Sequence, residues 1–327
     1  MFPTPEIIEA AHRRIHPYIH CTPLMTSRAI NEMVGAELVF KCENFQKVGA
    51  FKFRGASNAV FSLTEEDMSH GVATHSSGNH AAALALAASL RGIKAYIVMP
   101  SNSSRVKIAA VEHYKGIITF CEPTLQARED TLAKILIQTN ATEIHPYNNY
   151  RIIAGQATAA KELIEDGGHF DVIMAPVGGG GLLSGTALSV SYFSPSTRVI
   201  AAEPMQADDA YQSFYEKRFI PSVNPDTIAD GLRTSLGSLT YPIIQEHVHQ
   251  IVRVSEVGII QAMRIIWERM KILVEPSSAV PLAALLENTF EHKDLRIGII
   301  LSGGNVDLEK LPFTEFGRKS KIVDPCS

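Results

Sequence analysis

Residues 72–99 read VATHSSGNHAAALALAASLRGIKAYIVM, and this stretch decides the fold class. Residues 72–75 and 95–99 are short runs of apolar and β-branched residues, which are typical of strands, and the Ala-rich segment 79–90 between them is typical of a helix. A strand, a helix and a second strand in this order predict two parallel strands joined by a helical crossover. The stretch therefore indicates an α/β protein.

The same alternation continues along most of the chain. Further helices are predicted over 105–114, 124–139, 150–165 and after 181, and further strands over 116–120, 172–175, 198–202 and 296–301. The last strand is almost entirely apolar, which is typical of a strand covered on both faces. We therefore predict two open, twisted, mostly parallel sheets with helices on both faces. We expect a small αβ domain over 71–145, inserted into a larger domain made of 1–70 and 146–327.

Composition narrows the possible classes of protein. The chain has 327 residues, of which 46% are hydrophobic and 20% charged, with a net charge of −4, so it can bury a large core and has no positive field to attract nucleic acid or a membrane surface. Its longest charge-free run, between Asp171 and Arg198, is interrupted by Pro176 and four glycines, which argues against a membrane span. Four scattered cysteines and no secretory signal predict a soluble, cytoplasmic protein.

Three glycine-bearing turns each follow a predicted strand: SSGNH at 76–80, GGGG at 178–181 and SGGN at 302–305. A glycine-rich turn that opens a helix exposes backbone N–H groups at the positive end of the helix dipole, which suits a phosphate, although any one such turn is as often only a tight connection. No Gly-Lys dipeptide is present, which excludes a P-loop. The dinucleotide spacing also fails, because its last position falls on Leu183 or Ser184. A cofactor with a single phosphate fits better.

The segment 44–56, NFQKVGAFKFRGA, places lysines among aromatic residues just before a predicted helix. A lysine in apolar surroundings has a lowered pKa and can act as a nucleophile toward carbonyl groups. Alone, such a lysine is far more often a surface residue with its stem on an apolar patch. The phosphate-type loops in the same chain make Lys52 a candidate for cofactor attachment.

Four motifs in order, AFKFRGA at 50–56 followed by the three glycine-bearing turns, resemble those of the fold type II pyridoxal-phosphate enzymes. Within that group the chain is most similar to the serine racemase and serine/threonine dehydratase family, from about residue 22 to residue 311. The resemblance implies a tryptophan synthase β-like architecture, in which two open α/β domains enclose pyridoxal 5′-phosphate, and a homodimer.

By the same resemblance, Lys52 would hold the cofactor covalently and remove the α-proton of the substrate. It also implies that the backbone of residues Gly178, Gly179, Gly180 and Gly181 would bind the phosphate of the cofactor. Asn79 would bind the 3-hydroxyl of the ring, Phe51 would pack on the ring face, and Ser302 would face the pyridine nitrogen. A neutral hydroxyl beside that nitrogen moderates the electron-withdrawing power of the ring, which suits β-elimination.

The substrate would be held by the turn that follows the strand at 72–75. The resemblance implies contacts to the substrate from Ser76, Ser77, Gly78, Asn79, His80 and, outside the turn, Arg128. Ordinary threonine dehydratases have alanine where this chain has Ser77. In the racemase branch that serine protonates the opposite face of the substrate, so Ser77 is the candidate second acid–base, although a serine here also suits a helix N-cap.

The segment 203–209, EPMQADD, follows a predicted strand. Two carboxylates six residues apart, with a backbone carbonyl between them, can supply oxygen ligands for Mg²⁺ or Mn²⁺, although an acidic loop alone is usually a solvated surface. The resemblance assigns Glu203, the carbonyl of Ala207 and Asp209 to a structural metal site.

The expected activity is that of a serine racemase and L-serine or L-threonine ammonia-lyase. Abstraction of the α-proton would be followed either by reprotonation or by loss of the β-hydroxyl to give a 2-oxo acid and ammonia. The alternative is a threo-3-hydroxyaspartate dehydratase, which would need a basic group near the pocket that the sequence does not place. A cysteine synthase is disfavoured by the SSGNH turn, and a ligand-sensing domain by the presence of both Lys52 and Ser77.

Overall fold

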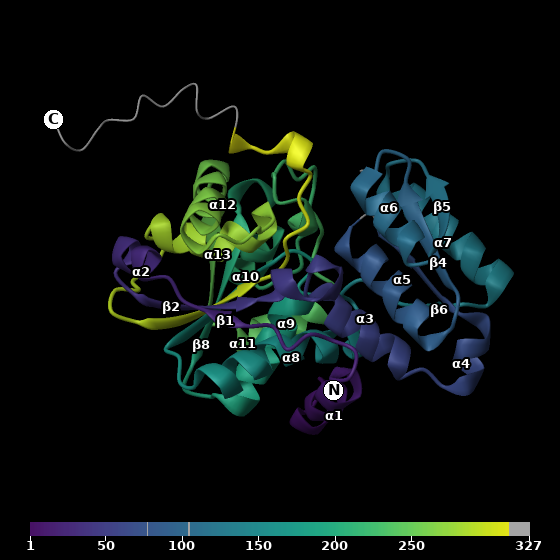
Figure 1. The fold of residues 1–327 in the computed structure, drawn as a ribbon, viewed down its shortest axis with the longest axis horizontal. Coiled ribbons are helices and arrows are strands. Elements are labelled where there is room, and N and C mark those ends of the chain that lie inside the picture. The colour runs from purple at the N-terminus through teal and green to yellow at the C-terminus, as the bar shows by residue number, and fades with distance from the viewer. Residues whose placement is uncertain (77, 104, 314–327) are drawn as a thin grey trace.

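Two sheets form the framework of the computed structural model, which describes residues 1–76, 78–103 and 105–313 (Figure 1). The six-stranded sheet has the order β1-β2-β10-β7-β8-β9 and the four-stranded sheet the order β5-β4-β3-β6. The strands are β1 (Leu24–Met25), β2 (Glu37–Cys42), β3 (Val72–His75), β4 (Ala95–Pro100), β5 (Ile117–Cys121), β6 (Thr142–Glu143), β7 (Val172–Pro176), β8 (Arg198–Pro204), β9 (Gln250–Val254) and β10 (Arg296–Leu301). Among these described strands only β1 and β2 pair antiparallel, so the predicted fold class is confirmed.

The four-stranded sheet is built from the stretch that predicted the fold. Strands β3 and β4 pair in parallel with Val72 opposite Ala95, and α5 (Asn79–Arg91) connects them. The alanines of α5 are buried against one face of this sheet, while Leu132 and Ile135 of α7 (Leu125–Thr139) pack on the other face. Helix α6 (Arg105–His113) lies beside α5, and α4 (Glu65–His70) leads into β3. Helices therefore cover both faces, as expected.

The six-stranded sheet is also covered on both faces, because alternate residues of its central strands enter different cores. In β10, Ile297 and Ile299 pack with one core, and Ile300 packs with the other. The helices around this sheet are α1 (Pro5–Ile15), α2 (Arg28–Val34), α8 (Tyr150–Gly167), α9 (Gly181–Phe193), α10 (Asp209–Glu216), α11 (Thr240–His247), α12 (Glu256–Met270) and α13 (Pro276–Leu286). No helix within the described residues is long and apolar enough to cross a membrane.

Helix α3 (Lys52–Phe61) lies between the two sheets and packs on both α5 and α8 (Figure 1). Its backbone meets that of α8 where two glycines face each other, because a Cβ on Gly155 would lie 2.6 Å from the Cα of Gly55. Such close approach leaves no room for side chains, so the glycine in the AFKFRGA motif fixes the position of α3. The first residue of this helix, Lys52, is thereby placed at the junction of the two sheets.

Candidate active site

The amine of Lys52 is held at the start of α3. Its Nζ donates a hydrogen bond to the carbonyl of Pro146 at 3.0 Å and lies 5.1 Å from the ring centroid of Phe51. Burial lowers the pKa of Lys52 to about 8, against the opposing effect of the Glu275 carboxylate. A larger fraction of this amine is therefore neutral near pH 7 than of an ordinary lysine, which is the state that attacks a carbonyl carbon.

A buried network of charges fixes the first turn of α3. Arg54 is fully buried and makes two hydrogen bonds to each of two carboxylates, Glu43 at 2.7 and 2.8 Å and Glu162 at 2.7 and 2.7 Å. Lys41, also fully buried, donates to Glu162 at 2.6 Å. Two cations thus face two anions with their hydrogen bonds made, which is the condition under which buried ions are tolerated.

The tetraglycine loop runs from the end of β7 to the start of α9. A Cβ on Gly179 would lie 2.4 Å from the ring of Tyr147, and one on Gly180, whose φ is +86°, would lie 2.8 Å from the hydroxyl of Thr240. Only glycines fit between these neighbours. Thr240 donates its hydroxyl to the Gly179 carbonyl at 2.9 Å. The N–H groups of the first turn of α9 have no acceptor within the helix, so the loop offers the donors that a phosphate needs.

The SSGNH turn joins β3 to α5. Ser76 donates its backbone N–H to the Val98 carbonyl at 3.0 Å and accepts the N–H of Gly78 on its hydroxyl at 3.3 Å. His80 is buried, its Nε2 bonds the Ile144 carbonyl at 3.0 Å, and burial lowers its pKa to about 3. His80 is therefore neutral. Ser77 lies outside the described residues.

Asn79, the first residue of α5, is held by two side chains from the other sheet. Its Nδ2 donates to both oxygens of Glu275, at 3.0 and 3.1 Å, and its Oδ1 accepts from Nδ2 of Asn305 at 2.9 Å. Burial, together with the charge of Asp230, raises the pKa of Glu275 to about 7. No sequence motif singled out Glu275. The available signal was a carboxylate between an apolar run and Pro276, where the chain is buried.

Ser302 is buried at the end of β10. Its carbonyl accepts the N–H of Phe51 at 3.0 Å, and its hydroxyl lies 3.1 Å from that of Ser278, a second residue that the sequence did not single out. The SGGN turn opens no α-helix; instead it brings Ser302 beside Phe51 and Asn305 beside Asn79. Gly303 is required because a Cβ there would lie 2.8 Å from Oε1 of Glu275.

The segment from His145 to Asn148, between β6 and α8, was also missed. Nδ1 of His145 accepts the N–H groups of Tyr147 at 3.3 Å and Asn148 at 2.9 Å, which places its proton on Nε2. Burial, with the nearby His75 and Lys52, lowers the pKa of His145 to about 4. This segment links Lys52, through the Pro146 carbonyl, to the tetraglycine loop, through the ring of Tyr147.

Arg128 is half-buried on α7, on the side of the site where His75 lies. Its Nε donates to the carbonyl of Thr124 at 3.4 Å, and its charge contributes to the lowered pKa of His75, after burial. Nδ1 of His75 is buried without a hydrogen-bond partner in the described part of the chain. The structure thus places Arg128 near a histidine that adjoins Lys52 through His145.

The acidic loop brings Glu203, at the end of β8, close to Asp209, the first residue of α10. Glu203 accepts the N–H groups of Ala210 at 3.1 Å and Tyr211 at 2.7 Å. Neither carboxylate oxygen of Asp209 accepts a hydrogen bond of normal geometry from the described residues. Burial raises the pKa of Glu203 well above its usual value, with Asp209 adding to the rise, and raises that of Asp209 to about 7.

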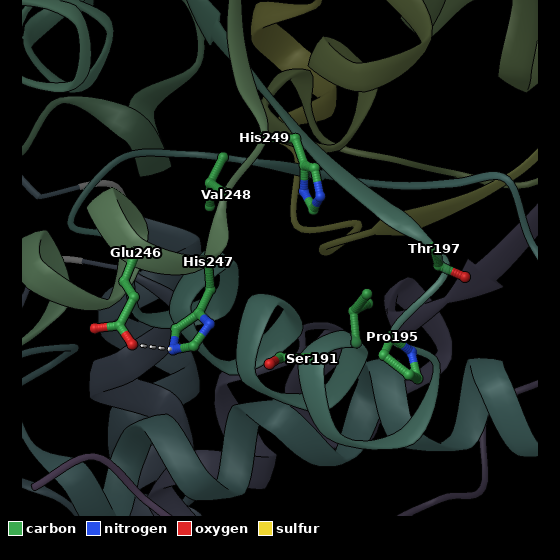
Figure 2. Close-up of a pocket in the computed structure, with 8 residues that line it drawn as sticks. Ser191, Pro195, Thr197, Glu246, His247, Val248 and His249 are labelled. Atoms are coloured by element: carbon green, nitrogen blue, oxygen red, sulfur yellow. Dashed lines mark ion pairs between the residues drawn. The ribbon is translucent and has the colours of Figure 1, made fainter.

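Two cavities have linings that do not include Lys52. The larger, about 380 Å³, adjoins Asn305, Asp230 and Lys107. Figure 2 shows the smaller, about 210 Å³, with the Glu246–His247 ion pair at one edge. The lining residues of the smaller cavity are Val190, Ser191, Pro195, Thr197, Glu246, His247, Val248 and His249. None of them belongs to the motifs above, so we place the site at Lys52 on its chemistry.

Known proteins resemble this chain over nearly its whole length. Residues 15–303 match the family model described as "Pyridoxal-phosphate dependent enzyme". The chain is 52% identical over 311 residues to the beta-hydroxyaspartate dehydratase of Paracoccus denitrificans, which covers 95% of this chain and 99% of that one. It is 50% identical over 309 residues to the serine racemase of Dictyostelium discoideum, covering 93% and 95%. The solved structure of maize serine racemase superimposes with a TM-score of 0.93 at 45% identity, covering 97% and 98%.

Proposed function

The chain belongs to the pyridoxal-phosphate dependent enzymes, and on that premise we propose that it is a serine racemase and L-serine or L-threonine ammonia-lyase. The observation on which the proposal rests is Lys52, a half-buried lysine with a pKa lowered to about 8, on the helix that lies between the two sheets. Relatives that carry the name serine racemase support the substrate class.

The residues around Lys52 fit the cofactor. The glycine-only loop from Gly178 to Gly181 offers helix N-terminal N–H groups to its phosphate, and Asn79 offers an amide to its ring oxygen. Ser302 supplies a neutral hydroxyl, suited to an unprotonated ring nitrogen, and Phe51 supplies an apolar face. When bound, the cofactor provides an electron-accepting ring that stabilises negative charge on the α-carbon of the substrate.

We assign the proton transfers to two side chains. Lys52, as the neutral amine, takes the α-proton from one face of the substrate. Ser77 is the proposed acid on the opposite face, where return of a proton gives the D-amino acid. If the β-hydroxyl instead takes a proton and leaves as water, the dehydrated amino acid that remains is hydrolysed by a second water to a 2-oxo acid and ammonia. The two outcomes therefore share the step at Lys52 and separate at Ser77.

The turn formed by Ser76, Ser77, Gly78, Asn79 and His80 is the proposed site for the substrate carboxylate. Its support is the N-terminus of α5, whose N–H groups and positive dipole end favour an anion. Arg128, on the side of His75, would add a positive charge to the same region. These assignments carry over from motifs, and of these residues Arg128 has a role in substrate binding alone, so Arg128→Ala is expected to raise KM with little change in kcat.

A second candidate function, a 3-hydroxyaspartate dehydratase, is favoured by three histidines near Lys52. After burial, His75, His145 and Lys52 lower the pKa of His80, and His75 and Lys52 lower that of His145. A substrate with a second carboxylate needs donors or positive charge beside it, and Nε2–H of His145 and the charge of Arg128 are candidates. The relative named beta-hydroxyaspartate dehydratase supports this candidate.

The deciding experiment is a product assay on cofactor-loaded protein with Mg²⁺. It offers L-serine, D-serine, L-threonine and 3-hydroxyaspartate, and follows both the 2-oxo acid and the chirality of the recovered amino acid. We expect D-serine from L-serine, lost in Ser77→Ala while pyruvate persists. Oxaloacetate formed much faster than pyruvate would favour the second candidate instead.

Lys52→Ala tests the premise of both candidates. We expect every activity to fall by about a thousandfold or more, because the group that moves the α-proton is gone. The matched control is Lys161→Ala, a buried lysine whose Nζ also lies over an aromatic ring, 5.6 Å from Phe193, but which pairs with Glu165 far from the site. Equal loss in both variants would contradict the assignment.

We also propose a structural Mg²⁺ or Mn²⁺ ion bound by Glu203, the Ala207 carbonyl and Asp209. The supporting observation is that Glu203 and Asp209 are buried carboxylates with no cation bonded to either in the described residues. Arg253, a cation at this loop, instead pairs with the third acid, Asp208, at 2.8 Å. Among the described residues no three His, Cys, Asp or Glu side chains gather as a metal site. A bound ion would therefore need backbone or water oxygens as well.

The remaining proposals concern organisation. We propose residues 71–145 as the small domain, supported by a four-stranded sheet that lies within them, and 1–70 with 146–327 as the large domain. A homodimer is supported by the family resemblance. A cytoplasmic location is supported by the free thiols of Cys21, Cys42 and Cys121. Light scattering on the purified protein tests the dimer directly.

A further inference from the structure

Glu275 is a buried carboxylate that no motif accounts for, and it touches a residue that the cofactor needs. It lies directly before α13, makes no hydrogen bond that caps that helix, and is 4% exposed. Both of its oxygens accept from Nδ2 of Asn79, a residue 196 positions away in the sequence. Burying the Glu275 carboxylate costs desolvation free energy, and the carboxylate does not cap its own helix. Its burial therefore requires another explanation.

The contacts of Asn79 fix which way its amide faces. Oδ1 accepts from Nδ2 of Asn305 at 2.9 Å, and Nδ2 faces the carboxylate of Glu275. Turning the amide over would set its oxygen against a carboxylate and its NH₂ against the NH₂ of Asn305, so both hydrogen bonds would be lost. Asn305 is itself anchored, because its Nδ2 also donates to the Val48 carbonyl at 2.7 Å.

We propose that Glu275 is a positioning residue that keeps the NH₂ group of Asn79 turned toward the ring oxygen of the cofactor. The NH₂ group has two N–H bonds; one suffices for the carboxylate, which leaves the second for the 3-oxygen of the ring. This inference rests on the proposed function, in which Asn79 binds that oxygen. It extends that function by making the cofactor site depend on a residue that directly precedes α13, one of the helices around the six-stranded sheet.

The charge of Glu275 makes the arrangement sensitive to pH. A protonated carboxyl can donate as well as accept, so it no longer distinguishes the two amide orientations. The charged groups around it come from three elements: Lys52 on α3, Asp230 in the turn Asp230–Leu232, and Lys107 on α6. Burial and the charge of Asp230 raise the pKa of Glu275, the hydrogen bond from Asn79 and the charge of Lys107 lower it, and the net value is about 7. Affinity for the ring is therefore expected to fall as pH drops through 7.

The test uses pyridoxine 5′-phosphate, which has the ring, 3-hydroxyl and phosphate of the cofactor but no aldehyde. It cannot react with Lys52, so the titration of that amine does not drive covalent attachment. Its Kd for cofactor-free protein is measured by fluorescence between pH 6 and 8.5. Because its phosphate titrates near pH 6 in every variant, the quantity read is the ratio of variant to wild-type Kd.

For Glu275→Gln we expect about tenfold weaker binding at pH 8.5 and a ratio that approaches one at pH 6, where the wild-type carboxyl is protonated too. The analogue without the 3-hydroxyl should show no such difference. Asp230→Asn should keep full affinity at pH 8.5 and move the wild-type pH dependence to lower pH, because it removes a negative charge near Glu275. Thermal unfolding of each cofactor-free variant checks that it is folded.

Two results would overturn the inference. If Asn79→Ala weakens binding but Glu275→Gln matches wild type at every pH, Glu275 does not position Asn79, and the proposed function stands. If Asn79→Ala also binds normally, the assignment of Asn79 to the ring oxygen is wrong, and the inference fails with it. Should Glu275→Gln unfold, the shift expected in Asp230→Asn still decides the matter, since an unshifted profile contradicts the role of Glu275.

Discussion

Two groups of buried charge lie on the six-stranded sheet, and they differ in how they are balanced. Arg54 and Lys41 face Glu43 and Glu162, with hydrogen bonds of 2.6–2.8 Å between the two cations and the two anions. The other group, Glu203 with Asp209, has two carboxylates and no cation bonded to either in the described residues, and the pKa of each is raised by burial.

The difference separates charges that stabilise the fold from charges for which we propose a bound cation. A balanced network costs little in the native state and specifies which helix meets which strand, here α3 with α8 and β2. An unbalanced pair destabilises the native state unless a cation joins it. Lys52 and Glu275 belong with the second kind, since burial shifts the pKa of each toward its neutral form. The residues to which we assign functions are thus ionisable groups whose burial is not balanced by a bonded opposite charge, as is common at functional sites.

The largest expected effect comes from unbalancing the first group. Arg54→Met leaves Glu43 and Glu162 buried with one cation between them, and we expect the free energy of unfolding to fall by about 3–5 kcal/mol. Chemical denaturation measures it. Arg54→Met with Glu43→Gln leaves Lys41 and Glu162 as a matched pair and should recover much of the loss. A double variant no more stable than the single one would show that packing, not charge, holds α3.

A smaller effect should come from balancing the second group. Mg²⁺ at about a hundred times its Kd should raise the free energy of unfolding by about 2.7 kcal/mol. The increase should be absent in Asp209→Asn and retained in Asp208→Asn, because Asp208 is already paired with Arg253. Thermal unfolding with and without Mg²⁺ and a chelator measures it. An equal response to Mg²⁺ in both variants would place the ion elsewhere.

The smallest effect is expected at an exposed ion pair. Arg264 and Glu268 lie one turn apart on α12 with 2.7 Å between Nε and Oε1, and both are about half exposed. Arg264→Ala should change the free energy of unfolding by no more than about 0.5 kcal/mol, because solvent and salt screen the pair. A loss of unfolding free energy comparable to that of Arg54→Met would mean that burial does not explain the contribution of the Arg54 network to stability.

The α/β fold could be predicted, and candidate cofactor residues could be named, because both depend on short stretches of sequence. The strand and helix periods over residues 72–139 are local, and the structure has those elements within one or two residues of their predicted bounds. The motifs around Lys52, Asn79, Gly178 and Ser302 are likewise contiguous, so each could be found without knowing its neighbours in space. The assignment of roles to them stays a prediction.

The residues that the sequence did not reveal depend on contacts between distant segments. Glu275 meets Asn79 across 196 positions, and Arg54 meets Glu162 across 108. Pro146 contributes a backbone carbonyl to Lys52, and any residue has a carbonyl, so no residue type marks that role. Tyr147 packs against the tetraglycine loop because Gly179 and Gly181 have no side chains and leave room for it. The order of residues along the chain does not indicate this contact.

By itself the sequence determined the class of fold and the family, and it named Lys52 as the candidate amine, because periodicity, glycine turns and an ordered set of motifs are properties of neighbouring residues. Only the tertiary structure decided what surrounds that amine: which carboxylates are neutralised, which stay unpaired, and which carboxylate orients Asn79. The physical reason is that pKa values and hydrogen-bond orientation depend on burial and on charges a few ångströms away. Those distances arise only when the two sheets come together around α3.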